Sequence, residues 1–221
     1  MPYSLALTRD TLDAGARAPR VLPPLNRVLY VLAGQILVRA DDKDTRLERA
    51  TGWHSAAACT VASLTGATIL RYEFRHAGAP HGGEEAPHAG SAMLLEHLVE
   101  LAPSHPYLMR ADRVDFDPGG VALPHRHKGG GIRYLLEGRI EVHVEGLAPR
   151  VVEPGQAWFE SGREPVYAAA DLVLPTSFMR VSILPRGIRG QSSIMYVDPA
   201  DAARSKPRTY TVYVDEPIEL R

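Results

Sequence analysis

The chain of 221 residues has a single cysteine, no long hydrophobic run and no surplus of charge of either sign. The lone thiol, Cys59, excludes an internal disulfide and a zinc cluster built from cysteines. Lys and Arg number 25 against 26 Asp and Glu, so the chain lacks the basic excess that phosphate binding in nucleic acids requires. No run approaches the ~20 apolar residues of a membrane-spanning helix. Arg9 and Asp10 fall where a signal peptide needs apolar residues, and we therefore expect a cytoplasmic protein that binds neither nucleic acid nor membrane.

Glycine and proline are plentiful, and they punctuate many short apolar runs. The 19 glycines and 18 prolines are spread along the chain rather than gathered in one block. Between them lie short runs rich in β-branched and aromatic residues, several of which alternate apolar with polar side chains: Arg27–Leu32, Thr68–Phe74, Ile140–Val144 and Met179–Leu184. This pattern is typical of short, half-buried strands, so the composition predicts an all-β sandwich or barrel.

Two further segments carry predictions of their own. Ser91–Leu101 predicts the one helix of the chain behind a serine cap, because its apolar residues fall largely on one helical face: Met93, Leu94, Leu95, Leu98 and Leu101. The late run Tyr210–Val214 predicts a strand that pairs with a sheet.

Two parts of the sequence repeat each other. Tyr30–Val38 aligns with Tyr134–Val142, and two looser matches follow in the same order, Thr51–His54 with Pro154–Phe159 and Leu70–Tyr72 with Met179–Val181. Three matches in one order indicate two copies of a single β unit. We therefore expect an N-terminal barrel in residues 1–75, a linker with the helix in residues 76–104, and a C-terminal barrel with a strand-forming tail in residues 105–221.

A histidine pair is the strongest chemical signal. Residues i and i+2 of a strand point to the same face, so His125 and His127 can converge on one ion. Neutral imidazole binds zinc, iron, nickel and copper. The alternative is a pair of histidines that only form hydrogen bonds inside a ligand pocket.

The segment around this pair resembles a known family. Gly119, His125, His127 and the following Tyr134–Gly138 look like the first motif of the cupin superfamily, and Glu153–Gly155 is similar to the turn that leads into its second motif. The resemblance implies a bicupin, with two tandem jelly-roll (double-stranded β-helix) barrels. It implies a homodimer as well, in which the tail strand Tyr210–Val214 could pair with a sheet of the second copy. It also implies a divalent metal, such as iron, manganese, nickel or zinc, and a chemistry similar to that of cupin dioxygenases such as quercetinase.

The chain departs from the family pattern at two ligand positions. The resemblance implies a glutamate where Gly131 stands and a third histidine near Val166. At most two of four family ligands are therefore present in this half, at His125 and His127. Glu160 is a candidate third ligand, because it ends the strand that enters the second motif.

Three more residues are candidates for binding a substrate. Arg133 shares the parity of His125 and His127, so an uninterrupted strand would direct its guanidinium into the barrel, where it could bind a carboxylate. A structural ion pair is the alternative. Trp158 and Tyr167 lie near the second motif and could line the same pocket.

Two hypotheses of function follow from these residues. The first is a metal-dependent enzyme that acts on a small molecule through His125 and His127, similar to a dioxygenase or, since the same scaffold supports other reactions, an isomerase or lyase. The second is a non-catalytic bicupin that binds or senses a small anion without metal, which the missing glutamate and third histidine favour.

Overall fold

The protein is described here from a computed structural model covering residues 2–15, 19–78, 90–102, 104–204 and 206–220. Nearly all of the regular structure is strand, and only two short 3₁₀ turns, η1 (Arg186–Ile188) and η2 (Pro199–Ala203), interrupt it. The predicted all-β class is confirmed. Among the described residues, no helix has the length and apolar character needed to span a membrane. The backbone divides into two compact units, residues 1–101 with 220–221 and residues 102–219.

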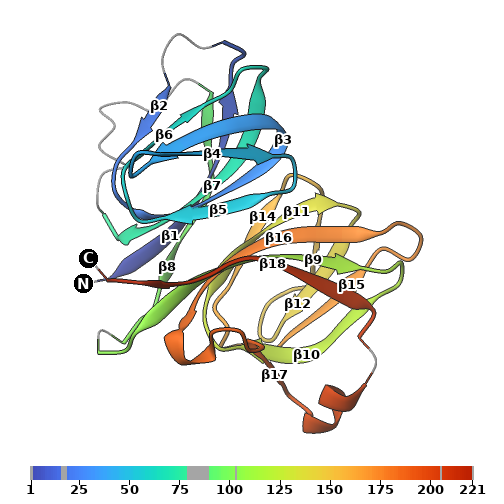
Figure 1. Ribbon diagram of the computed structural model, residues 1–221. Coiled ribbons are helices and arrows are strands. Elements are labelled where there is room, and N and C mark those ends of the chain that lie inside the picture. The colour runs from blue at the N-terminus through green and yellow to red at the C-terminus, as the bar shows by residue number, and fades with distance from the viewer. Residues whose placement is uncertain (1, 16–18, 79–89, 103, 205, 221) are drawn as a thin grey trace. The chain divides into compact units, whose positions relative to one another are not determined.

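The first unit is a curled eight-stranded sheet (Figure 1). Its strands run in the order β2-β6-β3-β7-β1-β8, with β4 and β5 paired to β3. Leu29, Val31 and Ile69 are fully buried in its core, because alternate residues of β3 and β7 face inward. The strands are β1 (Tyr3–Leu12), β2 (Arg20–Leu22), β3 (Asn26–Ala40), β4 (Lys43–Glu48), β5 (Gly52–Ser55), β6 (Cys59–Ala62), β7 (Ala67–His76) and β8 (Ser91–Val99).

The second unit is a jelly-roll barrel of two five-stranded sheets (Figure 1). One sheet runs β13-β12-β15-β10-β17 and the other β14-β11-β16-β9-β18. The core cluster includes Leu135, Ile140 and Trp158. The strands are β9 (Tyr107–Phe116), β10 (Val121–His127), β11 (Gly131–Glu137), β12 (Ile140–Val144), β13 (Arg150–Val152), β14 (Ala157–Glu160), β15 (Val166–Ala170), β16 (Thr176–Pro185), β17 (Ile194–Tyr196) and β18 (Arg208–Ile218).

The predicted linking helix is wrong. Ser91–Val99 forms β8, an edge strand antiparallel to β1. Ser91, expected to cap a helix, instead donates a hydrogen bond to Asp10 of β1 at 2.5 Å, and Glu96 accepts one from Ser4 at 2.7 Å. Hydrogen bonding to β1 therefore outweighs the intrinsic helix propensity of the methionine and leucines. Residues 79–89 of the predicted linker lie outside the described part of the chain.

The tail is a strand, as predicted, and its partner is in the same chain. β18 pairs antiparallel with β9 from Arg208↔Phe116 to Ile218↔Tyr107, with one bulge between Val212 and Val214. This pairing brings the tail alongside the strands that surround the site described below. A homodimer stays a prediction.

The internal repeat appears in the strand registers. Leu29 lies opposite Trp53 and Arg71, while Arg133, its counterpart 104 residues later, lies opposite Trp158 and Arg180. The three short sequence matches therefore mark strands that pair in the same way in the two units.

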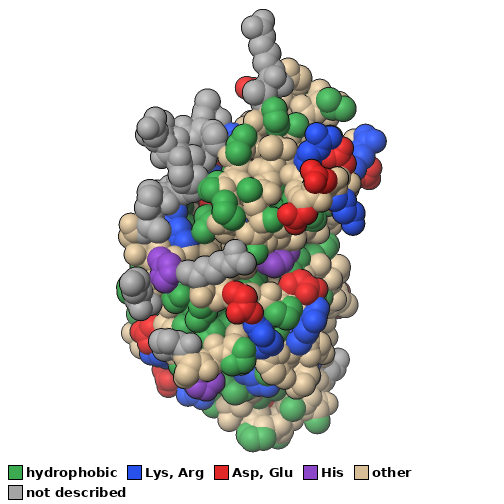
Figure 2. Space-filling model, turned by 60° about the vertical axis from the view of Figure 1, so that its left-hand side comes forward, with side chains coloured by type: hydrophobic (Ala, Val, Ile, Leu, Met, Phe, Trp, Pro, Cys, Tyr) green, Lys and Arg blue, Asp and Glu red, His purple; other side chains and the backbone are tan. Residues whose placement is uncertain are grey.

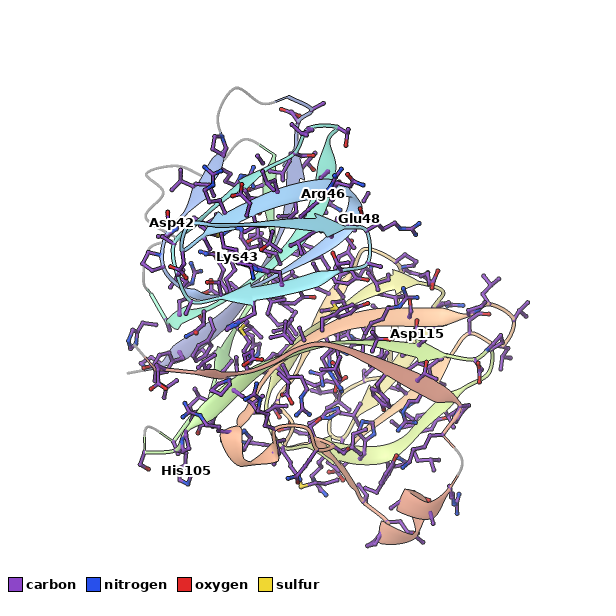
Figure 3. All side chains as sticks on the ribbon, viewed as in Figure 1. Asp42, Lys43, Arg46, Glu48, His105 and Asp115 are labelled. Atoms are coloured by element: carbon purple, nitrogen blue, oxygen red, sulfur yellow. The ribbon has the colours of Figure 1, made fainter. Side chains whose placement is uncertain are left out.

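The exposed charges are mixed in sign. On the face drawn in Figure 2, Lys and Arg side chains lie beside Asp and Glu side chains rather than in patches of one charge. Asp42, Lys43, Arg46 and Glu48, labelled in Figure 3 on β4 and the turn before it, give one example. The surface drawn there matches the near-zero net charge of the sequence.

Gly138 directly follows β11 in a conformation that requires glycine. Its φ is +75°, and a Cβ placed there would lie 2.4 Å from the Pro175 carbonyl oxygen. Gly146 also has a positive φ, +83°, but a Cβ there would meet no atom within 4 Å. Gly138→Ala should therefore lower the free energy of unfolding by more than the ~1 kcal/mol expected for Gly146→Ala, as measured by urea denaturation. Equal losses in the two variants would contradict the close approach.

Candidate functional site

The two histidines of β10 lie side by side inside the second unit. The ring centroids of His125 and His127 are 4.8 Å apart, edge to face, and both residues are buried. Nδ1 of His125 lies 2.7 Å from the Leu123 carbonyl oxygen. Since a carbonyl only accepts, Nδ1 carries the proton in the neutral ring and Nε2 has the free lone pair.

Glu160 reaches the histidines from β14. It lies directly opposite Gly131 in the β11–β14 ladder, so its carboxylate stands across from the position where the resemblance implied a glutamate. Its Oε2 is 3.2 Å from Nε2 of His127, and its Oε1 accepts a hydrogen bond from Nε1 of Trp158 at 2.8 Å. Sequence reasoning placed this residue near the pair, and the structure brings the three side chains together.

Arg133 contacts the same carboxylate. Its side chain is almost fully buried, and Nη2 lies 2.7 Å from Oε2 of Glu160. Nη1 donates to the Gly131 carbonyl oxygen at 2.6 Å. The alternation expected from parity therefore directs Arg133 inward, where a buried ion pair neutralises its charge.

Burial and this ion pair fix the protonation states. Burial lowers the pKa of His127 to about 3, so the imidazole is neutral near pH 7. Burial acts to raise the pKa of Glu160, but the Arg133 charge and the hydrogen bond from His127 outweigh it and hold that pKa below its usual range. Burial also lowers the pKa of His125. The site thus combines two neutral imidazoles, one carboxylate and one guanidinium.

As arranged, these residues do not fit a resident divalent metal. Arg133 already contacts Oε2 of Glu160, and Trp158 holds Oε1, so a metal would have to displace a buried guanidinium and leave its charge unpaired. Val166, at the expected third-histidine position, lies opposite His125 and offers no ligand atom. Within the described ranges, no three His, Cys, Asp or Glu side chains are grouped as a metal site.

A side chain at position 131 would also collide with its surroundings. A Cβ on Gly131 would lie 2.5 Å from the Val181 carbonyl oxygen and 2.4 Å from the Ser182 hydroxyl. Strands β11 and β16 approach so closely here that the glutamate of the family pattern has no room.

Of the other two predicted pocket residues, Trp158 lies in the interior of the barrel and Tyr167 does not. Trp158 is buried and lines the interior beside Glu160. Tyr167 is half-buried and packs edge to face against His143, with ring centroids 5.5 Å apart, and it lines neither cavity described below. The strand alternation of β15 explains this, because Val166 and Ala168 face inward and Tyr167 faces the opposite way.

Two cavities of the second unit lie at or beside this site. The space next to His125, His127, Arg133 and Glu160 measures about 30 Å³, which is room for roughly two water molecules. A larger cavity of about 390 Å³ lies between β9, β18 and the segment from Gly190 to Tyr196. Arg180, Ile194 and Tyr210 line both cavities.

Sequence reasoning missed several charged residues of this region. Arg180 on β16 forms a bidentate ion pair with Asp112 of β9, and both side chains are buried. Arg208 and Tyr210 lie on one face of β18, beside this pair. An arginine inside the apolar run Met179–Leu184 was the signal available for Arg180, whereas the position of β18 depends on a long-range strand pairing.

One part of the second unit matches a known family. Residues 112–169, which include His125, His127, Arg133 and Glu160, match the family described as Cupin domain. These residues therefore form a cupin domain. A search of curated proteins finds no match.

Solved structures share this fold over most of the chain. Salicylate 1,2-dioxygenase from Pseudaminobacter salicylatoxidans is 11% identical over 81% of this chain and 70% of its own, with a TM-score of 0.54. A cupin 2 conserved barrel domain protein from Leptotrichia buccalis is 14% identical over 83% and 85%, at 0.51. An oxalate decarboxylase is 13% identical over 91% and 73%, at 0.64. At these identities the likeness shows the fold, here that of tandem cupin barrels.

The burial of neutral His127 predicts a pH dependence of stability. The unfolded chain takes up a proton at this histidine near its ordinary pKa of 6.5, whereas the folded protein takes it up only near 3. The free energy of unfolding should therefore fall between pH 7 and pH 4, by about 1 kcal/mol or more from this residue. His127→Gln, which keeps an N–H donor for Glu160, should show a smaller fall in urea denaturation. Equal falls in both proteins would contradict a buried, neutral His127.

The Arg133–Glu160 pair predicts non-additive mutations. Glu160→Gln leaves the Arg133 charge buried without its counter-ion and should destabilise the protein by roughly 3 kcal/mol or more. The double variant Arg133→Leu/Glu160→Gln should lose less, because Leu29 stands at the position equivalent to Arg133 in the first unit and both charges are gone. Chemical denaturation of the two variants and of Arg133→Leu measures the coupling. A double variant less stable than both single variants would contradict the ion pair.

Proposed function

We propose that the second unit binds a small molecule through protein side chains alone, without a resident metal. The observation that carries this is the contact between Arg133 and Glu160, since the guanidinium provides the positive charge beside the His125–His127 pair that a metal would otherwise bring. This is the second of the two hypotheses drawn from the sequence.

Two further features support binding rather than metal chemistry. The central cavity of about 30 Å³ cannot admit an organic substrate next to the histidines unless side chains move. The neighbouring cavity of about 390 Å³ has the size of a small-molecule site. The similar structures include a dioxygenase and a decarboxylase, but identities of 11% and 13% do not transfer either reaction to this chain.

Metal analysis tests the proposal directly. Protein purified without a histidine tag should contain far less than one equivalent of iron, manganese, nickel or zinc by mass spectrometry. The His125→Ala/His127→Ala variant should give the same result. Arg133→Leu is the matched variant, because it releases Glu160 from its ion pair. Added divalent metal should therefore raise its melting temperature while leaving that of the unaltered protein unchanged. Stoichiometric metal that disappears in the double histidine variant would overturn the proposal.

A further inference from the structure

The larger cavity of the second unit is lined by charged residues that mostly neutralise one another. Arg110 forms a bidentate pair with Asp215, at 2.8 and 3.0 Å, and Arg180 forms one with Asp112. In both arginines, Nε and Nη2 together hold the two carboxylate oxygens. These two guanidinium groups are therefore already compensated.

In a third arginine, Arg208, the Nε and Nη2 side of the guanidinium contacts hydroxyl oxygens instead of a carboxylate. Arg208 is buried, and its Nε and Nη2 donate to the hydroxyl oxygens of Tyr210 and Tyr196, at 2.6 and 3.0 Å. Its Nη1 donates to the Val121 carbonyl oxygen at 2.9 Å. No carboxylate of the described residues pairs with Arg208, so a buried positive charge is held only by neutral oxygens. Such a charge favours an anion close by.

The hydroxyls of Tyr210 and Tyr196 accept from Nε and Nη2 of Arg208, as the two carboxylate oxygens do in the Arg110–Asp215 and Arg180–Asp112 pairs. Each accepts a hydrogen bond from Arg208, so its own O–H is directed elsewhere, and no acceptor in the described part of the chain receives it. Both tyrosines line the larger cavity, as does Lys206, whose ammonium lies 5.3 Å from the Tyr196 ring centroid. Lys206 also has no carboxylate partner among the described residues.

We propose that this cavity binds the carboxylate of a small organic acid, through the Tyr196 and Tyr210 hydroxyls and the Lys206 ammonium, with Arg208 polarising both hydroxyls from behind. Ile194 and Val212 supply apolar wall for the rest of the molecule. Lys206 is the charged side chain of the cavity lining that has no carboxylate partner among the described residues, and the two neutral hydroxyl donors beside it match the two oxygens of a carboxylate. This inference rests on the proposed function and names its ligand class.

Calorimetric titration of the full chain with three probes tests the ligand class. Benzoate carries the carboxylate, benzamide has the same shape without the charge, and inorganic phosphate is the competing oxyanion. Benzoate should bind at least about tenfold more tightly than benzamide, because hydrogen bonds to a charged acceptor are the stronger ones. Equal affinity for benzoate and benzamide would overturn anion recognition, and tighter binding of phosphate would overturn the carboxylate assignment.

Matched tyrosine variants test the location. Tyr196→Phe and Tyr210→Phe should each weaken benzoate binding about tenfold, because each removes one O–H donor and leaves the ring in place. Tyr213→Phe, on the same strand but outside the cavity lining, should bind as the unaltered protein does. Arg208 is left intact because it also binds the Val121 carbonyl of β10. Thermal melts check that every variant is folded, and unchanged affinity in both cavity variants would overturn the site.

Metal analysis of the same preparation separates the two proposals. Metal-free protein that does not bind benzoate would overturn this inference and leave the proposed function standing. Stoichiometric metal at the histidine pair would overturn the proposed function itself.

Discussion

The ion pair between Arg133 and Glu160 is the contact on which the interior of the second unit depends. It keeps a buried carboxylate ionised, and that carboxylate in turn orients His127 and Trp158. A buried pair of this kind is stable only while both partners remain, because either charge alone would be left in an apolar interior. The guanidinium, the carboxylate and the imidazole therefore form one unit, and no member of it can be assigned a role separately from the others.

The two units place different chemistry on one pattern of strands. Arg71 of β7 and Arg180 of β16 occupy equivalent register positions, and each forms a bidentate pair with an aspartate, Asp10 or Asp112. Next to this shared feature, the first unit has Leu29 where the second has Arg133. A buried arginine–aspartate pair is thus part of the architecture of both barrels, whereas the Arg133–Glu160 pair belongs to the second alone.

The sequence predicted whatever depends on local alternation and internal repetition. The strand parity of β10 placed His125 and His127 on one face, and the repeat identified segments that form corresponding strands in the two units. Prediction from the sequence failed where a long-range contact decides the local structure. Ser91–Val99 has helix-forming residues but becomes a strand because β1 offers its hydrogen-bonding edge. Likewise, nothing local indicates that Arg208 would be buried beside Tyr196, because that contact requires β18 to pair with β9 and β17 to pair with β10.

The tail strand explains how a filled barrel can still offer room to a ligand. Side chains occupy the centre beside His127, where only about 30 Å³ is free, and the larger space lies along β18. That strand brings Tyr210 and Arg208 close to Arg180. Arg180 and Tyr210 line both the small cavity beside the histidine pair and the larger cavity. Glu160 neutralises Arg133 at the centre and Asp112 neutralises Arg180, whereas Arg208 of β18 has no carboxylate partner among the described residues. Among the described side chains, the uncompensated charge of Arg208 and the larger cavity therefore both lie on the side of the barrel that β18 completes.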